Sequence, residues 1–411
     1  MAKSKTQITQ DLYGKFIMNT YGLPEPMFVR GKGAYLYDAN RHEYLDFSSG
    51  ISVCNLGHCH PAVTKAITTQ AKKLVHVSNL FLNENSPKLA ELIVSKSFGN
   101  GGRVFFCNSG AEANEGLIKL ARKWGNQTGR NEIIVMNNSF HGRTLATLAA
   151  TGRLKYREGF QPDMQGFSFA DFNHIESVKK AFSPKTCAVL LEAVQGEGGI
   201  LPAEPSFVKE LAEFCKARDI LLLFDEVQCG MGRTGKLFAW QHYGIKPDAF
   251  SIAKGIANGI PMGAFVCNKK LGNILTPGTH GTTFGGGPLA TAASLAVFHA
   301  IEEEKLLDNV VRQGKYLRKK IETELSGFPF VQSVRGMGLM LGIVLDFPAS
   351  TILPLLRKKG LIALSAGENV LRLLPPFIIN ADQCDEAVAI IKAAFSEYEE
   401  KSAINTKGRK Q

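Results

Sequence analysis

Short, continuous apolar runs alternate with amphipathic segments through the middle of the chain. The apolar runs lie at 103–108, 132–137, 187–192, 220–225 and 249–253. Strands that are apolar on both faces are typical of a parallel sheet covered on both sides. Between the runs, 111–124 and 205–219 have helical spacing. This alternation predicts an α/β domain over residues 55–290, with a mostly parallel central sheet and helices on both faces.

The pattern changes beyond residue 290. A long amphipathic stretch at about 289–327 leads to a strand-like run at 338–346. A short helix, a strand at 369–375 and a final amphipathic helix at about 381–401 follow. We expect residues 291–411 to form a smaller α+β domain, and the turn-rich residues 1–54 to pack on it.

Composition narrows the possible partners and the compartment. The 411 residues carry a formal net charge of +11, but the basic residues are scattered and no nucleic-acid-binding signature accompanies them. The apolar runs are too short to span a bilayer, and the N-terminus has no apolar signal-peptide core. We therefore expect a cytoplasmic protein that binds neither nucleic acid nor membrane.

The eight cysteines predict buried thiols rather than disulfides, and no metal site. Most of them lie inside apolar segments, as free thiols commonly do. Cys54, His58, Cys59 and His60 cluster in "CNLGHCHP", but their spacing is not that of a zinc site and no second ligand pair follows.

Several predicted strands end in residues that can bind or react with a ligand. Ligands of parallel sheets bind beyond the carboxyl ends of the strands. In "CNSGAEANEG" (107–116) a glycine turn leads into a helix, whose first amides suit a phosphate, although Ser109 would also cap an ordinary helix there. Asp225 closes the run "ILLLFD". A buried carboxylate there needs a cationic partner, such as a protonated pyridine nitrogen. The alternative is that Asp225 is an ordinary turn or helix-capping residue.

Two further segments complete this group of residues. In "NNSFHGRTLAT", Phe140 can cover a flat ring and Arg143 can hold a carboxylate, although a core aromatic and a surface ion pair are the simpler alternatives. Lys254, in "AFSIAKGIANGIPMG", ends its own strand and is followed by Gly255 and Gly259. It either reaches out to solvent or forms a Schiff base. Together these strand ends indicate a pyridoxal phosphate site.

At this point the sequence resembles a known family. "NSGAEANE", "FHGRT", "QGEGG", "DEVQCGMGRTG", "SIAKG" and "HGTTFGGGPLA" are similar to the motif series of the class III, fold type I aminotransferases. They occur in the family's order from about residue 20 to 400. The resemblance implies the fold type I architecture of pyridoxal-phosphate-dependent transferases and a homodimer with shared active sites.

The resemblance also implies a role for each matching residue at the cofactor, with Lys254 and Asp225 as the catalytic pair. The implied contacts are the phosphate turn at Gly110 and Ala111, stacking by Phe140, the ring nitrogen at Asp225, the phenolic oxygen near Gln228, the Schiff base at Lys254, and the neighbouring subunit's phosphate at Thr283.

For the substrates, the resemblance implies two carboxylate-binding arginines. Arg143 corresponds to the arginine that binds the α-carboxylate of the substrate. Arg372 corresponds to a second arginine, with which Glu197 can pair. The alternative for Arg372 is a purely structural ion pair. Such pairing masks Arg372 while an ω-amino substrate binds and frees it for the carboxylate of glutamate or 2-oxoglutarate. Thr282 corresponds to a residue lining the substrate site.

The residue at position 51 bears on the identity of the amino donor. Ile51 stands where ornithine aminotransferases carry a tyrosine that contacts the free α-amino group of ornithine. An apolar residue there favours a donor with an acylated α-nitrogen, so we expect N2-acetylornithine to donate its terminal amine to 2-oxoglutarate. Ornithine, succinylornithine and 4-aminobutyrate remain alternative donors, and isomerisation of glutamate 1-semialdehyde is a more distant one.

Overall fold

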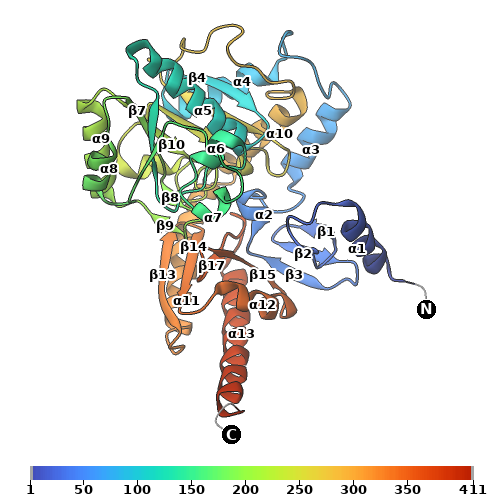
Figure 1. The fold of residues 1–411 in the computed structure, drawn as a ribbon. Helices are drawn as coiled ribbons and strands as arrows, with labels where there is room; N and C mark the ends of the chain where they lie inside the picture. Colours follow the sequence, from blue (N-terminus) through green and yellow to red (C-terminus); the bar gives the residue numbers. More distant parts are fainter. Residues whose placement is uncertain (1–2, 409–411) are drawn as a thin grey trace.

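A computed structural model describes residues 3–408, and its core is a seven-stranded sheet (Figure 1). Strand β12 runs antiparallel to both of its neighbours, and the other pairings are parallel. The five strands expected from the apolar runs are confirmed, whereas β6 and β12 were not predicted. In sheet order the strands are β4 (Arg103–Cys107), β12 (Gly263–Cys267), β11 (Ala249–Ile252), β10 (Leu221–Asp225), β7 (Thr186–Glu192), β5 (Glu132–Met136) and β6 (Phe167–Ala170).

Alternate side chains of the central strands enter two separate hydrophobic clusters, one on each face of the sheet. Leu221 and Leu223 of β10 pack with helix α5 (Gly110–Gly125). Leu222 and Phe224 pack in the cluster that holds α4 (Asn85–Ser97), α8 (Ile175–Ala181) and α9 (Pro205–Ala217). Both faces are therefore covered, which explains the continuous apolar runs.

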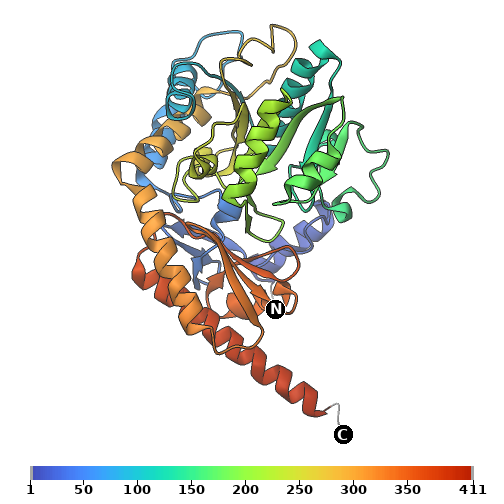
Figure 2. The same ribbon diagram turned by 90° about the vertical axis from the view of Figure 1, so that its left-hand side faces the viewer.

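The C-terminal part begins with two helices rather than one continuous helical stretch. Helices α10 (Pro288–Glu303) and α11 (Leu306–Glu324) are separated at Lys305, whose φ of 51° is left-handed. An antiparallel sheet follows, and α13 (Ala381–Gly408) lies against α11 (Figure 2). The sheet contains, in order, β13 (Val331–Met337), β14 (Met340–Leu345), β17 (Val370–Leu373) and β16 (Leu364–Ala366).

Strands near the N-terminus join this C-terminal part. Strands β1 (Phe28–Lys32), β2 (Tyr35–Asp38) and β3 (Glu43–Asp46) form a sheet in which β3 pairs in parallel with β15 (Leu361–Ile362). The domain boundaries remain a prediction. The remaining elements are α1 (Lys5–Phe16), α2 (Ser49–Ser52), α3 (Pro61–Ala71), α6 (Leu145–Ala149), α7 (Leu154–Arg157), β8 (Val194–Gln195), β9 (Leu201–Pro202) and α12 (Leu353–Lys358), with short 3-10 turns at 126–128, 239–243, 254–257 and 349–351.

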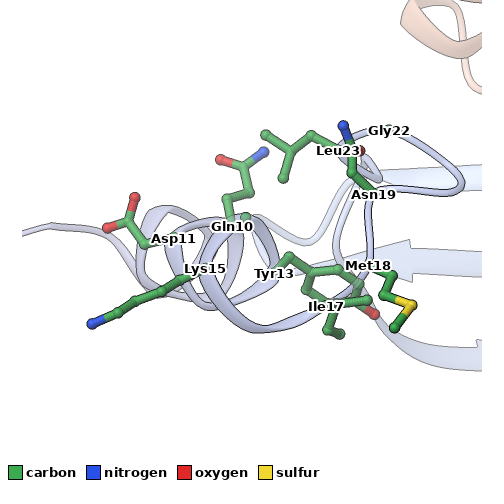
Figure 3. A pocket seen from close by; sticks show the side chains of 10 residues that line it. Gln10, Asp11, Tyr13, Lys15, Ile17, Met18, Asn19, Gly22 and Leu23 are labelled. Carbon is green, nitrogen blue, oxygen red and sulfur yellow. The ribbon is translucent and has the colours of Figure 1, made fainter.

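The N-terminal segment forms a cavity of about 640 Å³ with the loop that follows α1 (Figure 3). Its lining includes Tyr13, Ile17 and Met18, all of which are exposed. Helix α1 itself buries no residue. This segment therefore has apolar side chains that the other described residues do not cover. In the described part of the chain, no helix has the length and apolar character needed to cross a bilayer.

Candidate active site

Polar residues meet at the carboxyl ends of three adjacent strands in the central sheet. Asp225 of β10 is in register with Glu192 of β7 and with Ser251 of β11. All three are buried. Because parallel strands end at the same sheet edge, the topology places these groups side by side, where a ligand of such a sheet binds.

Asp225 is only 3% exposed, and its carboxylate accepts hydrogen bonds from distant parts of the chain. Oδ2 lies 2.7 Å from Nδ2 of Asn114 and 2.8 Å from Nδ1 of His141. Oδ1 accepts from the Val227 amide at 2.9 Å. These contacts fix the carboxylate in place. It is therefore suited to hold a cationic group.

Glu192 fixes the loop that carries Phe140. Its Oε1 accepts from the Phe140 amide, and its Oε2 accepts from the Gly196 amide, both at 3.0 Å. Burial and the neighbouring Asp225 charge raise the pKa of the Glu192 carboxyl to about 7. Glu192 is buried, and its two hydrogen bonds anchor the loop beside Asp225.

Lys254 lies two residues after the end of β11 and has a left-handed φ of 49°. Within residues 3–408, its amine makes no hydrogen bond or ion pair. Burial lowers the pKa of this amine below 10.5, since a charged ammonium loses hydration there. A buried lysine with a lowered pKa and no bonded partner can serve as a nucleophile and as a base.

The N-terminus of α5 lies in the same region of the sheet. Ser109 caps the helix by accepting from the Glu112 amide at 3.2 Å. The amides of Gly110 and Ala111 come first in the helix and so have no intrahelical acceptor, which suits an anion. A Cβ at Gly110 would lie 2.7 Å from Val227 Cγ1, so a larger residue does not fit without a shift.

Arg372 and Glu197 form an ion pair at the side of the site. Arg372 Nη1 lies 2.5 Å from Glu197 Oε1 and 3.0 Å from Gln228 Oε1. Burial opposes the charge on Glu197, but the charge and hydrogen bond of Arg372 outweigh it and lower the pKa of this carboxyl. Arg372 is 3% exposed, and its Nε has no acceptor among the described residues. The guanidinium therefore retains a free donor.

Arg143 is held in a different way. It is exposed and makes no hydrogen bond or ion pair with the described residues. Its Cζ lies 4.1 Å from the ring centre of Tyr156 and 5.5 Å from that of Phe140. Aromatic contacts thus position this guanidinium while its N–H edge stays unpaired.

Ile51 lies in α2, which is a left-handed turn. Residues 49–52 all have positive φ, and Ile51 has φ 67° and ψ 56°. Such a conformation is rare for a β-branched residue. The turn is held by the hydroxyl of Ser49, which donates to the Leu374 carbonyl at 2.7 Å, and by that of Ser52, which donates to the Gln228 carbonyl at 3.2 Å. Ile51 is 40% exposed beside the Gln228 segment.

Thr282 and Thr283 lie in a loop that contacts the start of α5 rather than the ends of β10 and β11. Oγ1 of Thr282 accepts from Asn108 Nδ2 at 3.4 Å and from the Gly285 amide at 3.2 Å. Thr283 is exposed, as is its neighbour Phe284. In the described chain, neither threonine hydrogen-bonds to the group around Lys254.

These residues fit pyridoxal phosphate. A buried carboxylate, an unpaired lysine amine and the free amides of a helix start match the pyridine nitrogen, the aldehyde and the phosphate of that cofactor. Sequence reasoning missed Asn114, His141 and Glu192, which position Asp225 and Phe140. Asn114 and His141 lie within the quoted motifs, but nothing in the sequence indicates that they contact Asp225.

Comparisons with known proteins agree with this arrangement. Residues 19–395 match the family model described as aminotransferase class-III. The chain is 46% identical to an acetylornithine aminotransferase of Bacillus subtilis, covering 95% of this chain and 99% of the relative. It is 45% identical to one of Methanocaldococcus jannaschii, covering 94% and 98%.

Solved structures of two related enzymes have the same fold. An N-acetylornithine aminotransferase of Stenotrophomonas maltophilia matches with a TM-score of 0.82 and 36% identity, over 95% of this chain and 99% of that one. An ornithine aminotransferase of Toxoplasma gondii, with partial occupancy of PLP at its active site, matches with a TM-score of 0.92 and 30% identity, over 97% and 96%.

Proposed function

Since this chain belongs to the class-III aminotransferases, we propose that it transfers the terminal amino group of N2-acetylornithine to 2-oxoglutarate, giving N-acetylglutamate 5-semialdehyde and glutamate. The observation that carries the choice of substrates is the pair of arginines in opposite states. Arg372 is masked by Glu197, while Arg143 has no acidic partner in the described chain. One open and one masked arginine suit two substrates that differ in the number of their carboxylates.

In this proposal, pyridoxal phosphate supplies an aldehyde that takes up the amino group and a ring that accepts electrons from the reacting carbon. The amides of Gly110 and Ala111 hold its phosphate, and Phe140 covers its ring. Asp225 holds the protonated ring nitrogen, and Asn114 and His141 keep the carboxylate in place. Gln228, which bridges Glu197 and Arg372, would contact the phenolic oxygen.

Lys254 is the group that moves protons. Its amine would hold the cofactor covalently at rest. The free amine would act as the base that takes a proton from the substrate carbon and as the acid that returns it. The lowered pKa of this buried amine supports the assignment, because the neutral form is the one that can act as a base.

The two arginines divide the substrates between them. Arg143 holds the α-carboxylate of the amino donor through two N–H groups. Glu197 pairs with the positive charge of Arg372 while the terminal amine of the donor enters. When 2-oxoglutarate follows, Glu197 moves aside and Arg372 holds the second carboxylate. Ile51 lines the site, where an apolar side chain leaves no polar partner for a free α-amino group. Thr282 lines the substrate site from the same loop as Thr283, which reaches the neighbouring subunit.

We also propose a homodimer, with Thr283 binding the phosphate in the neighbouring subunit. Leu80, Phe81 and Leu82 are 86%, 67% and 100% exposed, and Phe284 beside Thr283 is 65% exposed. A cavity of about 580 Å³ is lined by 78–83 and by residues of the 280–285 loop. Clustered exposed apolar side chains are typical of an interface, so this loop is suited to enter a second copy.

A panel of amino donors tests the proposal. N2-acetylornithine, N-succinylornithine, ornithine and 4-aminobutyrate are each assayed with and without 2-oxoglutarate. We expect N2-acetylornithine to give the highest kcat/KM and all turnover to require 2-oxoglutarate. Lys254→Ala abolishes turnover and the absorbance of the bound aldehyde, whereas Lys185→Ala at an exposed position retains both. A higher kcat/KM with ornithine or 4-aminobutyrate, or conversion of glutamate 1-semialdehyde without 2-oxoglutarate, contradicts the proposal.

A further inference from the structure

Tyr156, on helix α7, lies at the centre of a cluster of cations and aromatic rings. Its ring centre is 4.1 Å from Cζ of Arg143, 5.1 Å from Cζ of Arg153 and 5.3 Å from Nζ of Lys155. Its ring also meets Phe140 edge to face, with centroids 5.7 Å apart and an interplanar angle of 83°. One half-buried tyrosine therefore contacts both the ring-covering aromatic and the unpaired arginine.

The way in which Arg143 is fixed needs explanation, because an exposed arginine is normally mobile or paired with an acid. An acidic partner would have to be displaced by each substrate carboxylate, as Glu197 must be displaced from Arg372. A stacked guanidinium keeps its planar N–H edge available for two hydrogen bonds to a carboxylate. The Tyr156 ring can therefore hold Arg143 in place without masking it.

A second arginine anchors the ring. Arg153 contacts Tyr156 and donates from Nη1 to the main-chain carbonyl of Glu197 at 2.7 Å. This bond ties α7 to the segment that carries Glu197. The Tyr156 hydroxyl makes no hydrogen bond with the described residues, so only its ring takes part in this packing.

From these contacts we infer that Tyr156 is a positioning residue whose ring orients Arg143 toward the α-carboxylate of the amino donor. The inference rests on the proposed role of Arg143. A cation–π contact contributes about 0.5 to 2 kcal/mol, which corresponds to a change in affinity of about 2- to 30-fold. Loss of the ring weakens binding of donors with a carboxylate and leaves donors without one unaffected.

The test compares two amino donors that differ only in that carboxylate, N2-acetylornithine and N-acetyl-1,4-diaminobutane. The absorbance of the holoenzyme is followed after mixing with excess donor, which gives a limiting rate and an apparent Kd for each. Tyr156→Leu removes the ring and Tyr156→Phe keeps it. Tyr316→Leu removes an exposed tyrosine ring from α11 and serves as the control. Thermal unfolding confirms that each variant is folded.

We expect Tyr156→Leu to raise the apparent Kd for N2-acetylornithine about 2- to 30-fold, with its limiting rate and both constants of the second donor nearly unchanged. Tyr156→Phe and Tyr316→Leu should behave as the wild type. The inference is overturned if Tyr156→Leu keeps the wild-type preference between the donors, or if it weakens both donors equally. Two other results would instead overturn the proposed role of Arg143. One is a wild-type enzyme that binds the two donors equally well, and the other is an Arg143→Met variant that keeps the wild-type preference for N2-acetylornithine.

Discussion

Replacing Glu197 by glutamine tests whether this carboxylate masks Arg372. Glutamine keeps the size of the side chain and an oxygen that can accept from Nη1 of Arg372, but it removes the negative charge. In the wild type that charge lies 2.5 Å from a guanidinium that is 3% exposed. A substrate carboxylate that binds Arg372 therefore competes with Glu197 for the same donors.

The size of the effect follows from what the substrate must displace. A hydrogen bond between charged groups contributes about 1.5–3 kcal/mol net. Each 1.4 kcal/mol is about a tenfold change in affinity, so removing the competitor lowers the KM for glutamate about 10- to 100-fold. The KM for N2-acetylornithine is expected to rise, since its terminal amine then enters beside an uncompensated cation.

The assay measures both directions of the reaction, with glutamate and with N2-acetylornithine as amino donor. The quantity of interest is the ratio of the two kcat/KM values. Glu322→Gln, on the exposed face of α11, is the matched control because Glu322 also faces an arginine, at 3.8 Å, but far more loosely. An unchanged ratio in Glu197→Gln, or a ratio shifted toward N2-acetylornithine, would refute the masking role.

Other predictions concern the buried acids and the dimer. Burial raises the pKa of Glu226 to about 8, so the folded chain holds a proton that the unfolded chain loses above about pH 4.5. The free energy of unfolding should therefore fall as the pH rises from about 5 to 8, by up to about 1.4 kcal/mol per pH unit. Urea titrations of Glu226→Gln should show a smaller slope. Asp225→Asn removes the charge opposite the ring nitrogen and should slow the donor half-reaction by about 100- to 1000-fold in single-turnover measurements, whereas a rate near the wild type contradicts its role. Lys254→Ala and Thr283→Ala chains with different tags can be co-expressed to form mixed dimers. One site of each mixed dimer then combines an intact Lys254 with an intact Thr283, so the activity at limiting cofactor should exceed that of either variant alone. No gain in activity would exclude a shared phosphate site.

The parts of the fold that could be predicted are those in which burial imposes a pattern. Strands covered on both faces must be apolar throughout, so β7 and β10 were evident as continuous runs. The break between α10 and α11 was not, because it depends on a left-handed backbone at Lys305, a residue that gives no such signal. Strand β6, with the sequence FSFA, is only partly buried and too mixed in polarity to be recognised.

The same limit applies to the site. Asp225 and Lys254 were evident because a charged residue at the end of an apolar run is costly and needs a reason. The residues that hold Asp225 could not be inferred, since Asn114 and His141 are 111 and 84 positions away along the chain. Glu192 looked like an ordinary strand end, and only its register with Asp225 shows that the two acids are neighbours.

The left-handed turn at residues 49–52 shows how the site depends on the stability of its surroundings. A left-handed conformation costs an L-residue about 1–2 kcal/mol, and three of these four positions are not glycine. The sum of about 3–6 kcal/mol is a large part of the roughly 5–15 kcal/mol that keeps a typical domain folded.

The contacts that offset this strain are the ones that assemble the site. Oδ1 of Asp46 accepts from the amides of Ser48 and Ser49 at 2.8 and 3.1 Å. Nε of Arg233, a fully buried cation, donates to the hydroxyl of Ser52 at 3.0 Å, and its Nη1 donates to carbonyls of the C-terminal part. Strain of this kind persists only where surrounding contacts over-determine the backbone. The position of Ile51 is therefore set by the contacts among the N-terminal strands, the Gln228 segment and the C-terminal part, and not by the local sequence alone.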